Sequence, residues 1–458
     1  MRKTHAMPIN TVSTAIEPPL SEAAAEAWIP RTCFKNGPPA QIGVELELLV
    51  ADARHPDGLA AHYPRHRHPA LLRDLAAGGL DGQLTVEPGG QVELSSRPGP
   101  NVARTVDVAR RDLASLRTRA ARSGARLVGI GVDPVRPPIR VGDQPRYMAM
   151  ENYLDAWGPA GRIMMCSTAS VQVNVEAGVW PAPDAARRDS GTAADGPAGT
   201  SPLQGIRQRW DLLHAVGPAL VAAFANSPRR AGRPTGWKSS RQAVWMRLDP
   251  ARTGVPPIRP GVDLEWAFTR WALDAPLMLV RRDDAPWTAP AGVSFRTWLR
   301  LGRSVVPDRH PPTIDDLAHH LSTLFPQVRP RGHLEVRYID AQPGPWWTVP
   351  PAVIAALLDD ESAADLARQA CQATEGRWRD AARAGLDDVE LSAAATRLLE
   401  IAATALRGRP DHTWLAGQVE GYLERWTARG RCPADDPLTG STELSTVYGN
   451  GNLGDEPS

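Results

Sequence analysis

The chain has few of the features that would place it outside the cell or in a membrane. Its 458 residues include four cysteines, which lie far apart and form no C-x-x-C pair. This spacing argues against a disulfide framework or a zinc site and predicts a cytoplasmic protein. No apolar run approaches the length of a membrane span, and no apolar segment follows Arg2 and Lys3 as it would in a signal peptide. We therefore expect no contact with a membrane.

A strong charge of one sign is also missing. The formal net charge is +1 at pH 7, so the overall balance gives no reason to expect a nucleic acid partner, and no obligate protein partner is evident. Histidine is scarce, with 11 residues, and His333 is the one candidate beside a predicted polar strand face. What remains is a globular composition, 42% hydrophobic and 22% charged, which can supply a sizeable core.

Five short segments alternate apolar and polar residues, which predicts half-buried β-strands. They are residues 42–48, 84–94, 170–176, 242–248 and 333–338. Glu45 and Glu47 share the polar face of one segment, and Glu335 and Arg337 share that of another. At about 3.3 Å per residue, the members of each pair lie roughly 6–7 Å apart along a strand.

Carboxylates gathered on one sheet face repel each other unless cations neutralise them. Oxygen ligands without partnering histidines favour Mg²⁺, and Mg²⁺ beside carboxylates commonly accompanies nucleotide phosphates. The strand pattern therefore predicts an enzyme that uses Mg²⁺ and ATP.

The segments between the strands predict an α+β fold. Pro88-Gly89-Gly90 interrupts the 84–94 strand, where we expect a turn or bulge that re-aims Glu87 relative to Glu93. Helices are expected at 21–29, 102–123, 205–225 and 263–274, from a capping box at Thr313 to before Pro326, and from about 351 to 427, with a clear apolar stripe at 391–406.

The composition along the chain predicts its division into parts. Residues 182–203 are rich in Ala, Asp, Gly, Ser, Thr and Pro and predict a disordered insertion. We expect a flexible N-terminus with a short helix over 1–40, a catalytic domain over 41–350, a helical C-terminal region over 351–430 packed on that domain, and a loose tail over 431–458.

Several motifs occur in one order over about 40–340. They are Ile42–Glu47, Val86–Ser95, Arg146–Met148, Met164–Asn174, Phe224–Pro228, Leu324–Arg329 and Leu334–Arg337. Together they resemble the second glutamate–cysteine ligase family, the plant and bacterial type, and Glu-Pro-Gly-Gly-Gln-x-Glu-Leu-Ser is the most specific of them. Residues 152–162 and 237–241 carry a narrower likeness, to actinobacterial ligases that make γ-glutamylcysteine for ergothioneine biosynthesis.

The resemblance implies a glutamine-synthetase-like fold, in which a curved antiparallel β-sheet flanked by helices forms a funnel that holds Mg²⁺ and ATP. The α+β pattern of the strands agrees with this. The chain departs from the plant-type motif at Leu46, where that motif has a histidine, and in the 182–203 insertion. Neither departure removes a charged group that the chemistry requires.

The implied reaction joins the side-chain carboxylate of L-glutamate to the amine of L-cysteine, with ATP activating the carboxylate as γ-glutamyl phosphate. By resemblance, the candidate Mg²⁺ ligands are Glu45, Glu47, Glu87, Glu93 and Glu335. Arg337 is expected to act with Glu335 in catalysis, with its guanidinium aimed at the transferring phosphoryl group. The candidate substrate-binding residues are Arg146 and Arg241, whose planar guanidinium groups suit the α-carboxylate of glutamate, and Gln172 and Asn174.

Other interpretations stay open from the sequence. The glutamates could face water on a surface strand, Arg337 could be a structural ion-pair partner of Glu335, and the two amides could close hydrogen bonds between strands. The function could be that of a ligase of the same fold with a different acceptor amine, of a binding protein that kept the fold, or of a metal-dependent hydrolase. The sequence does not indicate which residues would recognise the thiol.

Overall fold

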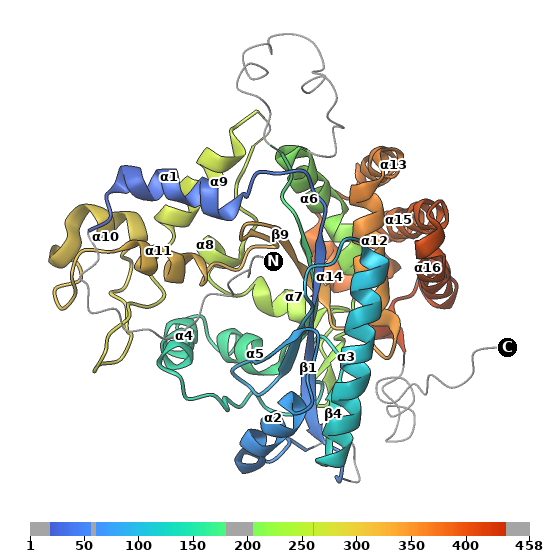
Figure 1. Cartoon of the computed structure of the whole chain (residues 1–458), viewed down its shortest axis with the longest axis horizontal. Helices are drawn as coiled ribbons and strands as arrows, with labels where there is room; N and C mark the ends of the chain where they lie inside the picture. Colours follow the sequence, from blue (N-terminus) through green and yellow to red (C-terminus); the bar gives the residue numbers. More distant parts are fainter. Residues whose placement is uncertain (1–18, 56–60, 180–204, 260, 437–458) are drawn as a thin grey trace.

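A computed structural model of the chain describes residues 19–55, 61–179, 205–259 and 261–436 (Figure 1). Within these ranges a seven-stranded sheet lies between two groups of helices, and every pairing in it is antiparallel. The expected α+β fold with an antiparallel sheet flanked by helices is confirmed. The predicted insertion at 182–203 lies outside the described residues. None of the described helices is both long and apolar enough to cross a bilayer.

The sheet is organised around its longest strand, β1 (Ile42–Asp52). The first part of β1 pairs with β3 and β5, and its last four residues pair with β4, so the order is β2-β3-β1-β5-β9-β8 with β4 beside the end of β1. The other strands of the sheet are β2 (Gln83–Val86), β3 (Val92–Ser95), β4 (Ala125–Val128), β5 (Ser170–Val175), β8 (Val328–Pro330) and β9 (Leu334–Asp340). A separate small hairpin joins β6 (Arg229–Arg230) to β7 (Arg233–Pro234).

One face of the sheet is apolar and holds the core. Val44, Leu46 and Leu48 of β1 point to this face and are at most 5% exposed. Three helices cover it, namely α3 (Val102–Arg122), α6 (Ile206–Ala223) and α12 (Val349–Asp359). Apolar residues recur along α3 at helical spacing, and the Asn101 side chain caps its first turn.

The C-terminal helices extend this same core. They are α13 (Glu361–Cys371), α14 (Trp378–Ala384), α15 (Val389–Arg407) and α16 (Thr413–Arg425). The stripe predicted at 391–406 is buried along α15. The predicted loose tail is wrong at its start, because Cys432 is fully buried and Asp435 accepts a hydrogen bond from Lys238. Residues 437–458 lie outside the described part of the chain.

Short helices form the layer opposite the polar face of the sheet. They include α4 (Pro145–Asp155), α5 (Ala160–Ser167), α7 (Ser240–Trp245), α8 (Pro250–Thr253) and α11 (Ile314–Leu321), with α1 (Glu22–Cys33), α9 (Leu264–Asp274) and α10 (Phe295–Leu301) beyond them. The predicted capping box at Thr313 is present in α11. Helix α2 (His68–Ala76) and short 3-10 turns at Arg65–Arg67, Gly302–Ser304, Trp346–Thr348, Gly385–Asp387, Pro410–His412, Thr427–Arg429 and Pro433–Asp435 complete the described elements.

The strand predicted at 242–248 is wrong, because most of this segment forms helix α7. Ser239 caps the helix, accepting a hydrogen bond from the Gln242 backbone N–H. All six residues of α7 are buried, including the polar Arg241 and Gln242, and the exposed Met246 and Arg247 follow in a turn, so exposure does not alternate as it would along a half-buried strand. Weak alternation over seven residues does not outweigh a serine cap and burial on all sides.

Candidate active site

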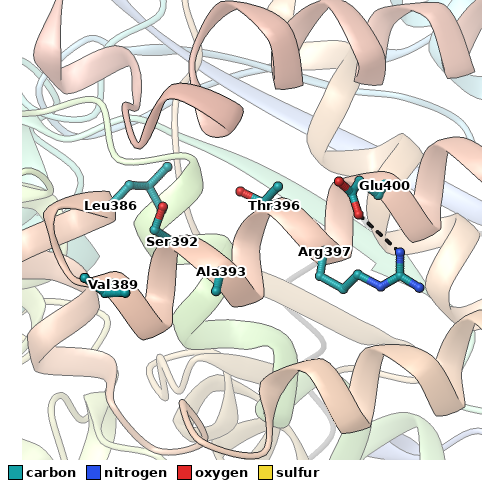
Figure 2. A pocket seen from close by; sticks show the side chains of 7 residues that line it. All are labelled: Leu386, Val389, Ser392, Ala393, Thr396, Arg397 and Glu400. Atoms are coloured by element: carbon teal, nitrogen blue, oxygen red, sulfur yellow. Dashed lines mark hydrogen bonds and ion pairs between the residues drawn. The ribbon is translucent and has the colours of Figure 1, made fainter.

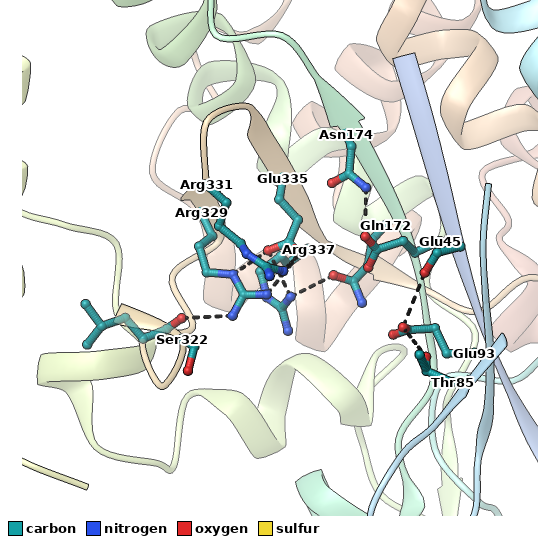
Figure 3. Close-up of polar contacts among 12 residues, drawn as sticks. Glu45, Thr85, Glu93, Gln172, Asn174, Ser322, Arg329, Arg331, Glu335 and Arg337 are labelled. Atoms are coloured by element: carbon teal, nitrogen blue, oxygen red, sulfur yellow. Dashed lines mark hydrogen bonds and ion pairs between the residues drawn. The ribbon is translucent and has the colours of Figure 1, made fainter. Parts of the chain in front are cut away.

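The strand register brings polar side chains from distant parts of the chain onto one face. Glu47 of β1 lies opposite Glu93 of β3, and Glu93 lies opposite Thr85 of β2. On the other side of β1, Glu45 lies opposite Gln172. Asn174, also on β5, lies opposite Glu335 of β9. Directly opposed residues of an antiparallel pair share a face, so Glu45, Glu47, Glu93 and Glu335 point to the side of the sheet away from the core; Figure 3 labels three of them, Glu45, Glu93 and Glu335.

Three of these glutamates form a compact group that we call the acidic trio. Glu47, Glu87 and Glu93 each offer a carboxylate oxygen, and the three oxygens lie within 4.8 Å of one another. Thr85 donates a hydrogen bond of 2.6 Å to Glu93. The β2–β3 turn places Glu87 there, since its N–H donates to Gln91 and its carbonyl accepts from Gly90, which has φ +85°. The expected turn at Pro88-Gly89-Gly90 is therefore present.

Electrostatic repulsion is built into the acidic trio. Burial, followed by the neighbouring carboxylate of Glu93, raises the pKa of Glu87 to about 8. Burial also raises the pKa of Glu47 and of Glu93, and the Glu47 charge adds to the shift of Glu93. Hard oxygen donors crowded at this spacing, with unfavourable ionised forms, fit a divalent cation such as Mg²⁺.

Glu45 lies next to the acidic trio but outside it. Its Oε1 accepts a hydrogen bond of 2.9 Å from the Asn174 amide nitrogen. Burial, then the charges of Glu335 and Glu93, raise the pKa of Glu45 to about 7. Glu45 is thus a fourth carboxylate that prefers its neutral form unless a cation is close.

Glu335 has the opposite surroundings. It is completely buried, and its two oxygens accept hydrogen bonds from Arg329 at 2.5 and 2.9 Å, from Arg337 at 3.1 Å and from Arg331 at 3.4 Å. Burial alone would raise the pKa of Glu335, but Arg329 and Arg337 hold it well below its usual range. We call these three arginines the arginine cage. The structure therefore places Glu335 with guanidinium groups and outside the acidic trio (Figure 3).

Arg329 and Arg331 did not figure among the predicted site residues. Arg329 lies opposite Glu335 in the β8–β9 pairing, and Arg331 follows in the turn between the two strands. The signal for them was Arg-Pro-Arg, which places two basic residues on the same side of a short strand just before the glutamate. β8 is only three residues long, too short for its alternation to be recognised.

Gln172 joins the two charged groups. Its amide nitrogen donates 2.7 Å to Glu47 Oε1, and its amide oxygen accepts 2.7 Å from Arg337. The side chain is 2% exposed. Both ends of the amide are occupied by protein groups, so in this structure Gln172 links the acidic trio to the arginine cage and does not offer a free substrate contact.

The two arginines expected to hold a carboxylate differ in how many of their N–H groups already have a partner. Arg241, on α7, is 2% exposed and donates 2.9 Å to the Arg337 carbonyl, while its Nε and Nη1 have no partner among the described residues. Its charge is close enough to Glu47 to act on that pKa. Arg146, on α4, already donates to the side chain and carbonyl of Ser322. Arg241 is therefore the better placed of the two for a carboxylate ligand.

One cavity lies apart from this charged face, and a second, very small one borders it. An open hollow of about 490 Å³ on α15 and the turn before it contains no predicted site residue, and its charged members Arg397 and Glu400 pair with each other at 3.2 Å (Figure 2). A second space of about 10 Å³, bounded in part by Arg337, Trp245 and Phe325, holds room for one water at most. Neither cavity brings the predicted site residues together as the polar sheet face does.

Comparison with known proteins is consistent with this site. The family model for glutamate–cysteine ligase family 2 (GCS2) matches residues 41–441. The glutamate–cysteine ligase EgtA of Mycobacterium tuberculosis is 39% identical over 426 residues, which cover 91% of this chain and 89% of that protein. The chloroplastic glutamate–cysteine ligase of Arabidopsis thaliana is 31% identical over 287 residues, covering 61% of this chain and 49% of that protein.

A search of solved structures gives more distant likenesses. A glutamate–cysteine ligase from Francisella tularensis, solved in complex with AMP, aligns over 87% of this chain and 84% of its own, with 13% sequence identity and a TM-score of 0.46.

Proposed function

The chain belongs to glutamate–cysteine ligase family 2, and on that premise we propose that it joins L-glutamate to L-cysteine at the expense of ATP, giving γ-L-glutamyl-L-cysteine. The observation that carries the proposal is the acidic trio and the arginine cage on one sheet face, linked through Gln172. A carboxylate is a poor acyl donor, so activation by ATP through γ-glutamyl phosphate supplies the leaving group.

The acidic trio would hold Mg²⁺, with Glu45 beside it. The fit is supported by the three converging oxygens and by the raised pKa of each carboxyl group, which a dication would reverse. Bound there, Mg²⁺ would neutralise charge on the phosphate oxygens of ATP. Glu335 remains a candidate ligand only if an oxygen is released from the arginine cage, because both of its oxygens are in use.

The arginines of the site would bind the negatively charged groups of the substrates. Arg337 would bring its guanidinium to the transferring phosphoryl group, held in direction by Glu335 and Gln172. Phosphoryl transfer depends mainly on positioning and on neutralising charge, which a fixed guanidinium provides. Arg241, whose Nε and Nη1 have no partner among the described residues, would bind the α-carboxylate of glutamate. Arg146 would play a lesser part, near Ser322, and Asn174 would hold Glu45 in place.

We also propose a pathway and a cellular compartment for the reaction. The 39% identity to the mycobacterial ligase over most of both chains supports the motif likeness to the ergothioneine branch, so we assign the product to ergothioneine biosynthesis. All four cysteines are buried and free, as suits a thiol-reducing cytoplasm.

An acceptor screen tests the function. Purified enzyme is given ATP, Mg²⁺ and L-glutamate, and phosphate release is measured with each amino acid in turn. We expect release to be at least tenfold faster with L-cysteine than with alanine, serine or 2-aminobutyrate, and mass spectrometry to detect γ-glutamylcysteine. Equal turnover with cysteine and alanine would replace cysteine with another acceptor amine, and no release with any acceptor would refute the ligase assignment.

A further inference from the structure

Asp340 is a buried carboxylate to which the reaction as described gives no part. It ends strand β9 five residues after Glu335 and is 2% exposed. Residues 335 and 340 would point to opposite faces of a regular strand, but the pairing of β5 with β9 shifts register between Val171 and Val173. Asp340 therefore lies opposite Ser170, on the same face as Glu335 and Arg337.

Three donors surround the Asp340 carboxylate. Ser227 Oγ donates at 2.7 Å and the Asn226 backbone N–H at 3.0 Å, both to Oδ2. Ser239 Oγ donates at 2.9 Å to Oδ1. Gly131 closes the remaining side, since a Cβ built there would stand 2.5 Å from the carboxylate carbon. These contacts hold the group in one orientation, and its charge also acts on the nearby Arg241 guanidinium.

Both serines also hydrogen-bond to helix α7, so they connect the fixed Asp340 carboxylate to this helix. Ser227 Oγ accepts from the Arg241 backbone N–H at 3.1 Å, and Ser239 Oγ accepts from the Gln242 backbone N–H at 3.2 Å. Because each hydroxyl hydrogen goes to Asp340, each oxygen turns its lone pairs toward the helix. The Gln242 side chain and Arg241 Nη2 then bond to the carbonyls of Tyr338 and Arg337 on β9. The first turn of α7 is thus fixed to the strand that carries Glu335 and Arg337.

We propose that Asp340 is a positioning residue, which acts through Ser227 and Ser239 to aim the Arg241 guanidinium at the α-carboxylate of the amino-acid substrate. This rests on the proposed function, since it takes Arg241 as the carboxylate-binding group. Arg241 Nε and Nη1 have no hydrogen-bond partner among the described residues, so the guanidinium is directed by its backbone, by one bond to the Arg337 carbonyl and by the nearby Asp340 charge. A shift of the first turn of α7 would carry those two donors away from the substrate.

The matched variants are single-atom changes. Ser227→Ala and Ser239→Ala each remove one hydroxyl between Asp340 and α7, and Asp340→Asn keeps the shape of the side chain. Ser240→Ala is the control, because Ser240 lies between Ser239 and Arg241 but its hydroxyl pairs with Thr235 at 2.7 Å. We expect KM for glutamate and the calorimetric Kd for glutamate to rise about 3- to 30-fold in Ser227→Ala and Ser239→Ala, with kcat within about twofold. Asp340→Asn should fall between these variants and the wild type, and Ser240→Ala should match the wild type.

A double-mutant cycle with Arg241→Gln separates positioning from support of the fold. If the serines act through Arg241, Ser227→Ala should have little further effect on glutamate affinity in the Arg241→Gln background. A full additive effect there would overturn the proposal, as would lower melting temperatures with unchanged KM and Kd in all three variants. A wild-type enzyme that turns over no glutamate would instead refute the proposed function, and it is assayed first.

Discussion

The acidic trio and Glu335 are the same type of side chain on the same face of one sheet, yet their surroundings are opposite. In the trio, carboxylates face one another and burial raises the pKa of each. At Glu335, three guanidinium groups surround one carboxylate and hold its pKa well below the usual range. In the trio, the charges of nearby arginines do not offset burial and mutual repulsion, whereas Glu335 has more positive charge around it than it can balance.

Under the proposed function, this difference would let one sheet face bind both parts of a metal–nucleotide complex. A dication relieves repulsion in the trio, and the surplus positive charge of the arginine cage attracts phosphate. Gln172 fixes the distance between the two parts, because its amide bonds to Glu47 at one end and Arg337 at the other. Variants of the acidic trio and of the arginine cage should therefore differ in their effects on stability and on phosphate release.

The largest effect is expected from Glu335→Ala. The change leaves three arginines around an empty space, and breaking a buried ion pair by removing one partner costs about 3–5 kcal/mol. We expect the free energy of unfolding, measured by urea titration at pH 7.5 without Mg²⁺, to fall by that amount, and phosphate release to be lost. Glu87→Gln is the matched comparison, since it removes a charge that the fold does not favour, and should leave stability equal or higher. Equal losses of unfolding free energy in both variants would contradict the opposite electrostatic surroundings of Glu335 and Glu87.

Arg337→Ala should mainly affect the reaction. Removing one charge-stabilising donor costs about 10²–10³ in rate, and we expect that fall in kcat for phosphate release at saturating Mg-ATP. Stability should change less than in Glu335→Ala, because Arg329 still holds Glu335 with two hydrogen bonds. Arg337→Lys keeps the charge without the planar fork and serves as the control, with an intermediate rate expected. A kcat within tenfold of wild type for Arg337→Ala would mean that Arg337 is a structural partner of Glu335 only.

The sequence predicted the trio well and the cage poorly, for a physical reason. Strand alternation over 42–48 and the turn at Pro88-Gly89-Gly90 are local signals that indicated the strands, and the family resemblance named Glu47, Glu87 and Glu93 among the candidate ligands. Two of the three arginines around Glu335 come from β8 and the turn after it, and β8 is too short for its alternation to be recognised. The 242–248 segment was misread because its alternation of apolar and polar residues hid the serine cap of a short helix, and Asp340 was overlooked because a bulge reverses the strand alternation before it.

The response to Mg²⁺ should depend on pH with a definite sign. The trio carboxyls have folded-state pKa values above their unfolded values, so their protonation favours the fold at low pH, and that stability is lost as the pH rises through about 8, the folded value for Glu87. Mg²⁺ binds the ionised form, and we expect it to raise the melting temperature by roughly 2–5 °C more at pH 8.5 than at pH 6. Glu335 behaves oppositely, since its contribution is present above the unfolded pKa and is lost on acidification through its lowered folded pKa. An equal rise at both pH values would count against Mg²⁺ in the trio.

The smallest effect concerns Thr85, whose hydroxyl donates 2.6 Å to Glu93 Oε1. Partners that orient a metal ligand are typically worth 10–100-fold in metal affinity, and we expect the lower end for this half-buried contact. Thr85→Val should weaken Mg²⁺ about tenfold in the Mg²⁺ dependence of the melting temperature, while Thr85→Ser, which keeps the hydroxyl, should not. Neither variant alters the arginine cage. Without Mg²⁺, the melting temperature of Thr85→Val should therefore fall only by the amount that the loss of one hydrogen bond causes. An Mg²⁺ affinity unchanged in Thr85→Val would mean that the hydrogen bond from Thr85 is not needed to orient Glu93, and that the geometry of the β2–β3 turn alone sets the metal site.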